Sequence, residues 1–482
     1  MFDKKNFPKK SENFSDWYLT LVQNAELVDY GPVKGTIIFR PYGYAIWENI
    51  QREMDIEIKE KGISNAYFPL FIPESFLKRE KEHVEGFSPE LAIVTYAGGE
   101  ELTEKIVVRP TSETIMYDSY SKWVQSWRDL PILINQWNNV VRWEKRTFPF
   151  IRTSEFLWQE GHTAHATHEE SLSYVDWAIK MYEKIYREFL ALPGFIGRKS
   201  ESEKFAGAVM TLTYETLMPD GKALQSCTSH DLGQNFAKAF DISFQDKNGE
   251  NQFAWQTSWG FSTRSIGGLI MTHGDDNGLK LPPRVAPVQV IILCAKKPKN
   301  TDEENSALDE YAQEVLKKLK AINIRVQIDN RNDESLGFKI NKWEQKGVPI
   351  RLEIGQNEIA ANSVTLVRRD TFEKISVDQD SLTEQVKTTI DEIHDGLYSS
   401  ALKFLNENTH VVDSYDEFKQ ILETKKGFLR AFWCEDADCE KKIKEETKAS
   451  TRCLPSDALE ENGKCIFCGK DAKYRWIFAQ SY

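Results

Sequence analysis

The sequence lacks the features that would place the chain in a membrane or in a secretory compartment. No apolar run approaches the roughly 20 residues needed to cross a bilayer, and the first residues, Met1 to Lys5, contain no signal-peptide core. A positive net charge is also missing, because the chain carries −12 at pH 7. That charge argues against a generally basic nucleic-acid coat, although local patches can still hold a polynucleotide. We therefore expect a cytoplasmic protein without a membrane partner.

Cysteine is scarce and unevenly spread, with 7 in the chain and five of them in the last 50 residues. Without a secretory signal, such a cluster indicates metal ligation rather than disulfides. Cys434-x4-Cys439 and Cys465-x2-Cys468 form two pairs about 25 residues apart, which suits a tetrahedral thiolate zinc site with a structural role. Cys453 lies between the pairs and could replace one of these four ligands.

The length of 482 residues predicts two to four domains, at roughly 100–200 residues for each domain. A hydrophobic share of 40% and a charged share of 28% are typical of a soluble globular protein. Pro282, Pro283 and Pro287 mark the first clear boundary. We predict a first domain over residues 1–284, a second over 285–395 and a third over 396–482.

The most informative stretch runs from Val140 to His168. Two apolar-aromatic runs, Val140–Trp143 and Phe150–Trp158, flank a charged turn, which predicts a β-hairpin. Pro149 is expected at its tip, because proline cannot donate a hydrogen bond to the ladder. Alternation would place Arg142 and Glu144 on one face of the first strand, and Arg152, Ser154, Phe156 and Trp158 on one face of the second.

Two guanidiniums beside a carboxylate and aromatic rings can hold a nucleotide, since arginine pairs with phosphate and stacks on bases. Judged on this stretch alone, a surface hairpin with ordinary ion pairs remains an open alternative.

Apolar residues at helical spacing predict two helices before the hairpin, over Asn13–Asp29 and Tyr44–Lys61. The second helix is expected to end at Gly62, and Pro41 and Gly43 are expected to separate it from a preceding strand.

Beyond residue 284 the strands Val288–Cys294 and Ile324–Ile328 alternate with helices such as Gly337–Gln345. This alternation predicts an α/β domain with a mainly parallel sheet.

In order and at the expected separations, these stretches resemble the prolyl-tRNA synthetase family of class II aminoacyl-tRNA synthetases, in the archaeal- and eukaryote-like form with a C-terminal zinc domain. The likeness covers nearly the whole chain. Motif 1 matches the helix from Tyr44 and the strand ending at Pro69-Leu70-Phe71, motif 2 matches Arg142-x-Glu144 and Arg152-x-x-x-Phe156, and motif 3 matches Gly260–Arg264 with the helix after it. Arg109–Thr114, Trp158–His162 and Gln225–Phe236 resemble signatures of this family alone.

The resemblance implies an enzyme that activates proline with ATP, forming prolyl-adenylate and pyrophosphate, and then transfers the prolyl group to the 3′ end of tRNA(Pro). It implies an α/β (α+β) fold: an antiparallel-sheet class II catalytic domain, an α/β anticodon-binding domain and a small α/β zinc-binding domain. It also implies magnesium on the phosphates of ATP, a structural zinc ion and a homodimer formed through motif 1. About a hundred residues between Phe156 and Arg264 leave no room for the editing insertion of the bacterial form.

The resemblance also assigns roles to individual residues. Arg142 would hold the α-phosphate and the proline carboxylate, Arg152 the far phosphates, and Glu144 would orient Arg142 or accept from the adenine amino group. Phe156 and Arg264 would enclose the adenine. The catalytic set is Arg142, Glu144, Arg152 and Arg264. The ATP-binding set is Arg142, Glu144, Arg152, Thr153, Phe156, Gln225, Thr228 and Arg264. The proline-binding set is Thr111, Glu113, Arg142, Trp158, Glu160, His162, Phe205, His230 and Ser262.

The segment Lys339–Gly355 resembles part of the family's anticodon-binding domain. Glu344 and Arg351 are therefore expected to read the anticodon guanines, because arginine can fork onto a guanine edge that an unstacked loop exposes. An Arg–Glu pair within the sheet is the structural alternative for either residue.

Two other patterns invite a chemical interpretation. His162, His165 and His168 are evenly spaced, but a spacing of three fits neither one face of a strand nor a His-x-x-x-His helix pair, so a metal site is disfavoured. Cys227 and His230 could form a thiol nucleophile and base, but no third orienting partner is evident.

Two rival functions remain. A catalytically silent synthetase relative could act as a tRNA-binding protein, although it need not keep Arg142, Glu144, Arg152 and Arg264. A threonyl-tRNA synthetase relative would require cysteine and histidine ligands for a catalytic zinc ion in the pocket, and no equivalent set is evident.

Overall fold

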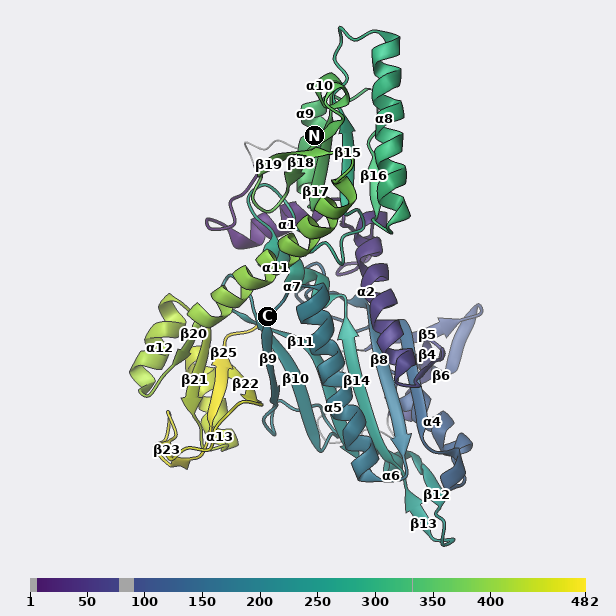
Figure 1. Cartoon of the computed structure of the whole chain (residues 1–482). Coiled ribbons are helices and arrows are strands. Elements are labelled where there is room, and N and C mark those ends of the chain that lie inside the picture. Colours follow the sequence, from purple (N-terminus) through teal and green to yellow (C-terminus); the bar gives the residue numbers. More distant parts are fainter. Residues whose placement is uncertain (1–6, 78–90, 332) are drawn as a thin grey trace.

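The computed structural model describes residues 7–77, 91–331 and 333–482. We call residues up to 284 the N-terminal region, 285–395 the middle region and 396–482 the C-terminal region, after the predicted boundaries. In Figure 1 the middle region lies above the N-terminal region, and the C-terminal region lies beside it. Within the described residues, no helix combines the length and the apolar character that a membrane span requires.

Two amphipathic helices begin the described chain, as predicted. α1 spans Phe14–Asn24, and its N-cap Asn13 accepts a hydrogen bond from the backbone N–H of Asp16. α2 spans Pro41–Glu60 and is followed by Gly62, whose φ of +84° favours glycine. Pro41, expected before the helix together with Gly43, lies instead in its first turn with Gly43, because proline is tolerated where no intrahelical N–H is needed.

An antiparallel sheet is the centre of the N-terminal region, and its strands come from distant parts of the sequence. The strand order is β9-β10-β11-β14-β8-β7, with β3 parallel to β7 at the edge. The bounds are β3 (Ser64–Asn65), β7 (Ile132–Val141), β8 (Glu155–His165), β9 (Gly194–Arg198), β10 (Met210–Leu217), β11 (Ala223–Gly233) and β14 (Trp255–Ser262).

The helix α5 (His168–Lys184), continued by a π-helical turn over Ile185–Phe189, covers one face of this sheet (Figure 1). Ser229 of β11 faces α5, because its hydroxyl donates to the backbone oxygen of Val175 over 2.9 Å. The neighbours Thr228 and His230 must then face the opposite side of the sheet, since side chains alternate along a strand.

Smaller elements surround the sheet. The α4 helix follows the three-stranded sheet β4-β6-β5, and α7 follows β14 directly. The bounds are β1 (Val28–Tyr30), β2 (Ile37–Phe39), β4 (Phe71–Pro73), β5 (Ala92–Ala97), β6 (Glu100–Val108), α4 (Glu113–Trp123), η2 (Trp127–Asp129), α6 (Asn235–Phe240), β12 (Ser243–Gln245), β13 (Asn251–Phe253) and α7 (Arg264–His273).

The predicted hairpin is present, but its strands are not where the pattern placed them. β7 and β8 pair from Ile132↔Ala164 to Val141↔Glu155, and residues 142–154 form the connection. Within it, the backbone groups of Phe148 and Arg152 exchange hydrogen bonds of 2.7 and 2.9 Å. Arg142, Glu144 and Arg152 therefore lie in an ordered connection and not on strand faces, because the connection forms its own bonds outside the ladder. Apolar alternation does not reveal where a ladder stops.

The middle region contains a five-stranded sheet of order β16-β15-β17-β18-β19. β15 is parallel to β16 and β17, as predicted, whereas β18 and β19 add two antiparallel pairings, so the sheet is mixed. The bounds are β15 (Val290–Cys294), α8 (Asp302–Ala321), β16 (Val326–Ile328), α9 (Leu336–Gln345), β17 (Ile350–Ile354), α10 (Gln356–Ala360), β18 (Ser363–Arg368), β19 (Lys374–Asp378) and α11 (Leu382–Glu407).

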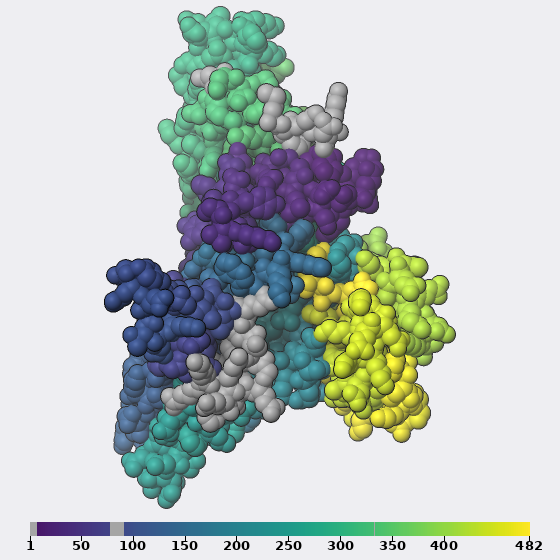
Figure 2. Space-filling model, turned by 180° about the vertical axis from the view of Figure 1, so that it is seen from behind, coloured from purple at the N-terminus to yellow at the C-terminus, as the bar shows by residue number. Residues whose placement is uncertain are grey.

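The stretch that contains α1, coloured purple, lies between the middle region and the rest of the N-terminal region when the molecule is seen from behind (Figure 2). The hydroxyl of Tyr42 donates to the backbone oxygen of Lys346 over 3.0 Å. Arg369 binds Asp275 with both terminal nitrogens, at 2.7 and 3.1 Å. These contacts fix the middle region on the N-terminal region.

The C-terminal region does not stand apart from the rest of the fold. α11 runs through the predicted boundary between residues 395 and 396 without a break. Strand β22 pairs with β9, so that β20-β21-β25-β22 continue the central sheet to eleven strands. The bounds are β20 (Thr409–Val411), α12 (Tyr415–Thr424), β21 (Phe428–Phe432), α13 (Ala437–Thr447), β22 (Ser450–Pro455), β23 (Gly463–Lys464), β24 (Asp471–Ala472) and β25 (Arg475–Ala479).

The junction of β9 and β22 depends on Gly197. A Cβ added there would lie 2.4 Å from the backbone oxygen of Leu454 and 2.7 Å from Cβ of Cys453. Such a close approach of two strands is open only to glycine. The sequence analysis did not predict this junction, because nothing in either strand pattern names its partner.

Burial of His273, in the last turn of α7, makes stability depend on pH. Its Nε2 lies 2.9 Å from the backbone oxygen of Leu190. Burial lowers the pKa of His273 to about 3, against the opposing effect of that hydrogen bond. Unfolded histidine titrates near about pH 6.5, so below this pH the unfolded chain binds the additional proton. The free energy of unfolding therefore decreases as the pH is lowered below this value, by about 1.4 kcal/mol per pH unit for this group.

His273→Gln keeps an N–H donor for Leu190 but removes the titration. We expect its free energy of unfolding to fall less steeply from about pH 6.5 to about pH 5, by roughly 1–2 kcal/mol over that range, in urea denaturation followed by tryptophan fluorescence. His410→Gln, at a half-buried histidine of β20, is the control. Equal slopes for the wild type and His273→Gln would contradict the prediction.

Candidate active site

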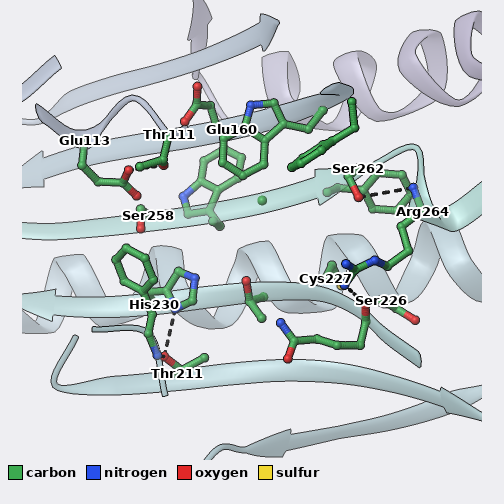
Figure 3. A pocket seen from close by; sticks show the side chains of 18 of the residues that line it. Thr111, Glu113, Glu160, Thr211, Ser226, Cys227, His230, Ser258, Ser262 and Arg264 are labelled. Carbon is green, nitrogen blue, oxygen red and sulfur yellow. Dashed lines mark hydrogen bonds between the residues drawn. The ribbon is translucent and has the colours of Figure 1, made fainter. Parts of the chain in front are cut away.

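A cavity of about 410 Å³ is formed on the sheet, and Figure 3 shows its side chains standing in front of the strands with helices behind them. β8, β11 and β14 supply most of the lining. The rest comes from the segments that join β6 to α4, β7 to β8 and β9 to β10, and from β10 and the first residues of α4 and α7. The predicted site residues that line it are Thr111, Glu113, Arg142, Phe156, Trp158, Glu160, His162, Phe205, Gln225, Thr228, His230, Ser262 and Arg264.

A smaller cavity of about 40 Å³ adjoins the first and shares Arg142, Phe156, Ser262 and Arg264 with it. The predicted residues Glu144, Arg152 and Thr153 also line it, together with Phe150 and Ile151. Every residue predicted for the nucleotide and the amino acid therefore lies in one of two adjoining cavities. In Figure 3, Glu113, Glu160 and His230 lie toward one end of the site, and Ser262 and Arg264 lie toward the other.

Glu160 is the centre of the acidic end, and it is almost completely buried. Its carboxylate accepts hydrogen bonds from the hydroxyl of Ser112, from Nδ2 of Asn138 at 2.6 Å and from Nε2 of Gln136 at 3.1 Å. Nε2 of His162 lies 3.0 Å away. Burial raises the pKa of Glu160, but the hydrogen bond and charge of His162, with the neutral donors, outweigh burial and lower it. Glu160 is therefore ionised at neutral pH.

His162 and Glu113 complete the acidic end. Burial lowers the pKa of His162. The hydrogen bond to Glu160 and the charges of Glu113 and Glu160 raise this pKa by more than burial lowers it, so the net shift is upward. Nδ1 of His162 lies 3.1 Å from the hydroxyl of Tyr117. The hydroxyl of Thr111 donates to Glu113, which is also buried.

Glu113, Glu160 and His162 bring ligand atoms within 4.8 Å of one another. The sequence analysis did not group them as possible metal ligands, because they come from two separate segments. Such a set can hold a metal ion or an organic cation. The hydrogen bonds already made by Glu160 favour an organic ammonium, which needs only acceptors and no fixed coordination geometry.

His230 and Phe205 form a neutral wall beside the acidic end. Their ring centroids are 4.7 Å apart, and Nδ1 of His230 lies 2.9 Å from the hydroxyl of Thr211. That hydroxyl also accepts from the backbone N–H of Phe205 over 3.0 Å, so it links the two residues of the wall. Burial, followed by the charge of His162, lowers the pKa of His230 to about 3. His230 is therefore neutral at physiological pH.

Arg142 lies between the two ends of the site. Its Nε donates to the backbone oxygen of Pro110 over 3.0 Å, and its guanidinium lies 5.5 Å from the ring centroid of Phe156 and 5.4 Å from that of Trp158. Burial lowers the pKa of Arg142, while Glu113 and other carboxylates oppose that shift. An arginine is still charged after such a shift.

Arg264 and Arg152 form the basic end. Nε of Arg264 donates to the backbone oxygen of Ile151 over 2.9 Å. Burial, and then the charges of Arg142 and Arg152, lower the pKa of Arg264 to about 10, which leaves it charged at neutral pH. Nε of Arg152 lies 3.4 Å from Glu144. Three guanidiniums that repel one another indicate a site for an anion of high charge, such as a polyphosphate.

The three evenly spaced histidines contact different partners. His162 contacts Glu160, Nδ1 of His165 lies 3.3 Å from Glu170, and His168 lies 2.8 Å from Asp231. In the described structure each of the three histidines therefore lies beside a different carboxylate. The thiol of Cys227 lines the main cavity, but burial raises its pKa well above the ordinary range, so it is not an activated nucleophile.

Sequence reasoning missed several residues that line the main cavity, among them Lys199, Glu203, Thr211, Ser226 and Ser258. Ser226 and Ser258 share strand faces with the predicted residues Thr228 and Ser262, so alternation along β11 and β14 could have found them. Lys199 and Glu203 lie in a polar segment without a motif, and their position depends on contacts with other parts of the chain.

Cys434, Cys439, Cys465 and Cys468 come together in the C-terminal region as a possible metal site. Sγ of Cys434 lies 3.8 Å from that of Cys439 and 3.7 Å from that of Cys468. A tetrahedral site with Zn–S bonds of about 2.3 Å has sulfur–sulfur distances of about 3.8 Å, so these residues fit such an ion. Cys453 is buried in β22 against Gly197 and is not one of the four.

Glu344 and Arg351 contact each other in the middle region. Nη1 of Arg351 lies 2.9 Å from Glu344, and Nε lies 2.9 Å from Glu353 of the same strand. The ion pair expected as the structural alternative is therefore present. Both residues border a small cavity with Trp343, so a role in binding a base stays a prediction.

Family models match three parts of the chain. A tRNA synthetase class II core domain (G, H, P, S and T) matches residues 95–273, an anticodon binding domain matches 289–389, and a prolyl-tRNA synthetase C-terminal domain matches 415–482. These matches agree with the α/β fold and with the antiparallel class II core that the sequence predicted.

Relatives that match over nearly their whole length are described as proline–tRNA ligases. The chain is 51% identical over 480 residues to a proline–tRNA ligase of Natranaerobius thermophilus, covering 99% of this chain and 98% of that protein. It is 50% identical over 483 residues to a proline–tRNA ligase of Borrelia garinii, covering 98% and 99%. A crystal structure of prolyl-tRNA synthetase from Cryptosporidium parvum, complexed with halofuginone and AMPPNP, superposes with a TM-score of 0.94 at 45% identity and covers 98% of this chain and 99% of that chain.

The resemblance predicted from the motifs is thus confirmed by whole-length matches and by a solved structure of the same fold. The chain belongs to the proline–tRNA ligase family, the prolyl-tRNA synthetases of class II.

Proposed function

We propose that the chain is an ATP-dependent proline–tRNA ligase, which forms prolyl-adenylate and then prolyl-tRNA(Pro). One observation carries the proposal. A single site has buried carboxylates at one end, the guanidiniums of Arg152 and Arg264 at the other, and Arg142 between them. An amino acid beside a nucleoside triphosphate has this distribution of charge, with one cationic ammonium and several anionic oxygens. The whole-length relatives favour this function over a threonyl-tRNA synthetase relative.

The acidic end would bind the secondary ammonium of proline. Glu113 and Thr111 offer acceptors, and Glu160 with His162 supports them from behind. Phe205 and the neutral ring of His230 would contact the pyrrolidine ring, with Trp158 closing the slot. A protonated His230 would repel the ammonium, so its lowered pKa favours binding.

The basic end would bind ATP. Phe156 and Arg264 would enclose the adenine, Gln225 and Thr228 would contact the nucleotide, and Arg152 would neutralise the far phosphates, with Glu144 orienting the guanidinium. Magnesium would arrive with ATP and neutralise its phosphates. Ser262 and Thr153 lie where hydroxyl donors could complete the lining.

Arg142 would join the two substrates, since it lies between the two ends of the site. The proline carboxylate attacks the α-phosphorus, a carboxyl O–P bond forms, and the bond to pyrophosphate breaks. The nucleophile is already ionised, so no general base is required, and catalysis consists of positioning and charge neutralisation. In the second step a ribose hydroxyl at the 3′ end of tRNA attacks the prolyl carbonyl carbon, and AMP leaves. Glu344 and Arg351 would contact the anticodon.

Arg142→Ala tests the assignment. The variant removes a charge that would be shared by both substrates, so proline-dependent ATP–pyrophosphate exchange should fall at least roughly 100-fold, while the melting temperature stays near that of the wild type. Arg128→Ala, at an exposed arginine of η2, is the matched control and should keep full exchange. Near-normal exchange by Arg142→Ala would remove this residue from the mechanism. A wild type without proline-dependent exchange would favour the silent tRNA-binding alternative.

We infer that the metal of the C-terminal region is a structural zinc ion, held by Cys434, Cys439, Cys465 and Cys468. Four thiolates fill a tetrahedral zinc site, so no position remains for a reacting water. The ion would fix the start of α13, because Cys439 lies in its first turn.

Elemental analysis of the purified chain should find one zinc ion per chain. Cys439→Ser should lose most of it and should lower the melting temperature. Cys453→Ser is the matched control, since this buried cysteine lies outside the cluster, and it should retain the full zinc content. Zinc loss from Cys453→Ser equal to that from Cys439→Ser would contradict the assignment of ligands.

We propose that the chain forms a homodimer through the segment that resembles motif 1. Large apolar side chains are exposed there, among them Tyr67 at 69% and Phe71 at 49% of their surface. Exposed apolar patches of this kind mark interaction sites, and identical chains meet most often around a twofold axis.

Sedimentation equilibrium should find a dimer for the wild type. Tyr67→Ser with Phe71→Ser should raise the dimer dissociation constant at least about tenfold, because two large apolar contacts are lost. Val411→Ser, which removes an equally exposed apolar side chain from β20, should leave the constant unchanged. A monomeric wild type would overturn this proposal but not the proposed activity.

A further inference from the structure

The segment between β9 and β10 forms one wall of the main cavity. Lys199, Glu203 and Phe205 of this segment all line the cavity. The ring of Phe205 packs at a tilt against that of His230, and its backbone N–H donates to the hydroxyl of Thr211. The segment contains no helix or strand of its own, so its conformation depends on the groups that hold it.

Glu440 of α13, in the C-terminal region, holds the beginning of this segment. Its carboxylate accepts a hydrogen bond from the hydroxyl of Ser200 over 2.9 Å and another from the hydroxyl of Ser202. Thr451 of β22 donates a third. Glu440 is only 4% exposed, so these hydroxyls replace the water that a carboxylate requires. The buried carboxylate therefore fixes the first residues of the segment to α13.

One ion pair and one cluster of three charged residues join the same segment to the C-terminal region. Lys444, one turn along α13, lies 2.8 Å from Glu203. Lys199 lies 2.7 Å from Glu215 of β10, and Arg452 of β22 binds the same carboxylate with two nitrogens at 3.0 Å. Lys199, Glu215 and Arg452 are all buried. Two of the three residues by which the segment lines the cavity are thus paired, directly or through one carboxylate, with the C-terminal region.

We propose that the C-terminal region acts as a positioning element for the amino-acid pocket, with Glu440 as the principal positioning residue. It acts through Ser200 and Ser202 on the segment that carries Phe205. This inference rests on the proposed function, because Phe205 and His230 would contact the pyrrolidine ring. The nucleotide end of the site is built by Arg152 and Arg264, with Arg142 between the two ends. The polar contacts described for these arginines, to Pro110, Ile151 and Glu144, lie outside this segment.

The geometry therefore predicts a split between the two substrates. When the hydrogen bonds of Glu440 to Ser200 and Ser202 are removed, Phe205 is held less firmly in place. Proline then loses contacts with its pocket. The contacts of ATP do not change. A loss of general stability would instead weaken both substrates or lower the amount of active enzyme without changing either KM.

Glu440→Gln keeps the size of the side chain and removes its charge, and Ser202→Ala removes one donor from the segment itself. We expect Glu440→Gln to raise KM for proline about tenfold in ATP–pyrophosphate exchange, Ser202→Ala to raise it about threefold, and both to leave KM for ATP within about twofold. Amide hydrogen exchange should show faster exchange in residues 199–209 for both variants. If Glu440→Gln fails to fold, Ser202→Ala tests the same contact from the other side.

Glu446→Gln is the matched control, because this carboxylate lies on the same helix and accepts from Tyr415 within the C-terminal region, 3.0 Å away. It should leave both KM values unchanged. Unchanged KM for proline in Glu440→Gln and Ser202→Ala, or equal increases for proline and ATP, would overturn the inference. A wild type without proline-dependent exchange would overturn the proposed function instead, so the two failures are distinguishable.

Discussion

The site depends on a carboxylate that stays ionised although it is buried. Glu160 is removed from water, which by itself would favour its neutral form, and it is kept charged by Ser112, Asn138, Gln136 and His162. These partners come from the β6–α4 connection, from β7 and from β8. The pairing of β7 with β8 places Gln136 directly opposite Glu160, so the register of the hairpin decides whether this network can form. A slip of one residue would turn Glu160 to the other face of the sheet.

The same sheet extends from the N-terminal region into the C-terminal region, so the two regions share one scaffold. The β9–β22 pairing and the buried cluster of Lys199, Glu215 and Arg452 make it a continuation of the scaffold. A buried cluster of this kind is weak support for stability, because desolvation offsets most of the attraction between its charges. It does select one arrangement of the two regions, since any other would leave a charge buried without a partner.

The sequence predicted many of the residues that line the two cavities, because most of them lie in short motifs whose spacing is fixed by local geometry. Phe156 and Trp158 alternate along β8, and Thr228 and His230 alternate along β11, so their common face follows from the strand period. The boundaries of the hairpin could not be predicted, because the backbone bonds of Phe148 and Arg152 are made outside the ladder. The role of α13 beside the pocket could not be predicted either. Glu440 and Ser202 are far apart in the sequence, and the residues around either one give no sign of their contact.

The separation of charge within the site follows from the chemistry of an amino acid. Its ammonium and its carboxylate are two bonds apart, so the protein must change from acceptors to donors over the length of one small molecule. Arg142 lies where the lining of the site changes from acceptors to donors. Burial lowers its pKa, and Glu113 and Glu160 both oppose this shift. The carboxylates that would bind the ammonium therefore also favour the charged form of the guanidinium that would bind the carboxylate. Neutralising the acidic end would weaken both halves of proline recognition together, and the two ends of the site act as one electrostatic unit.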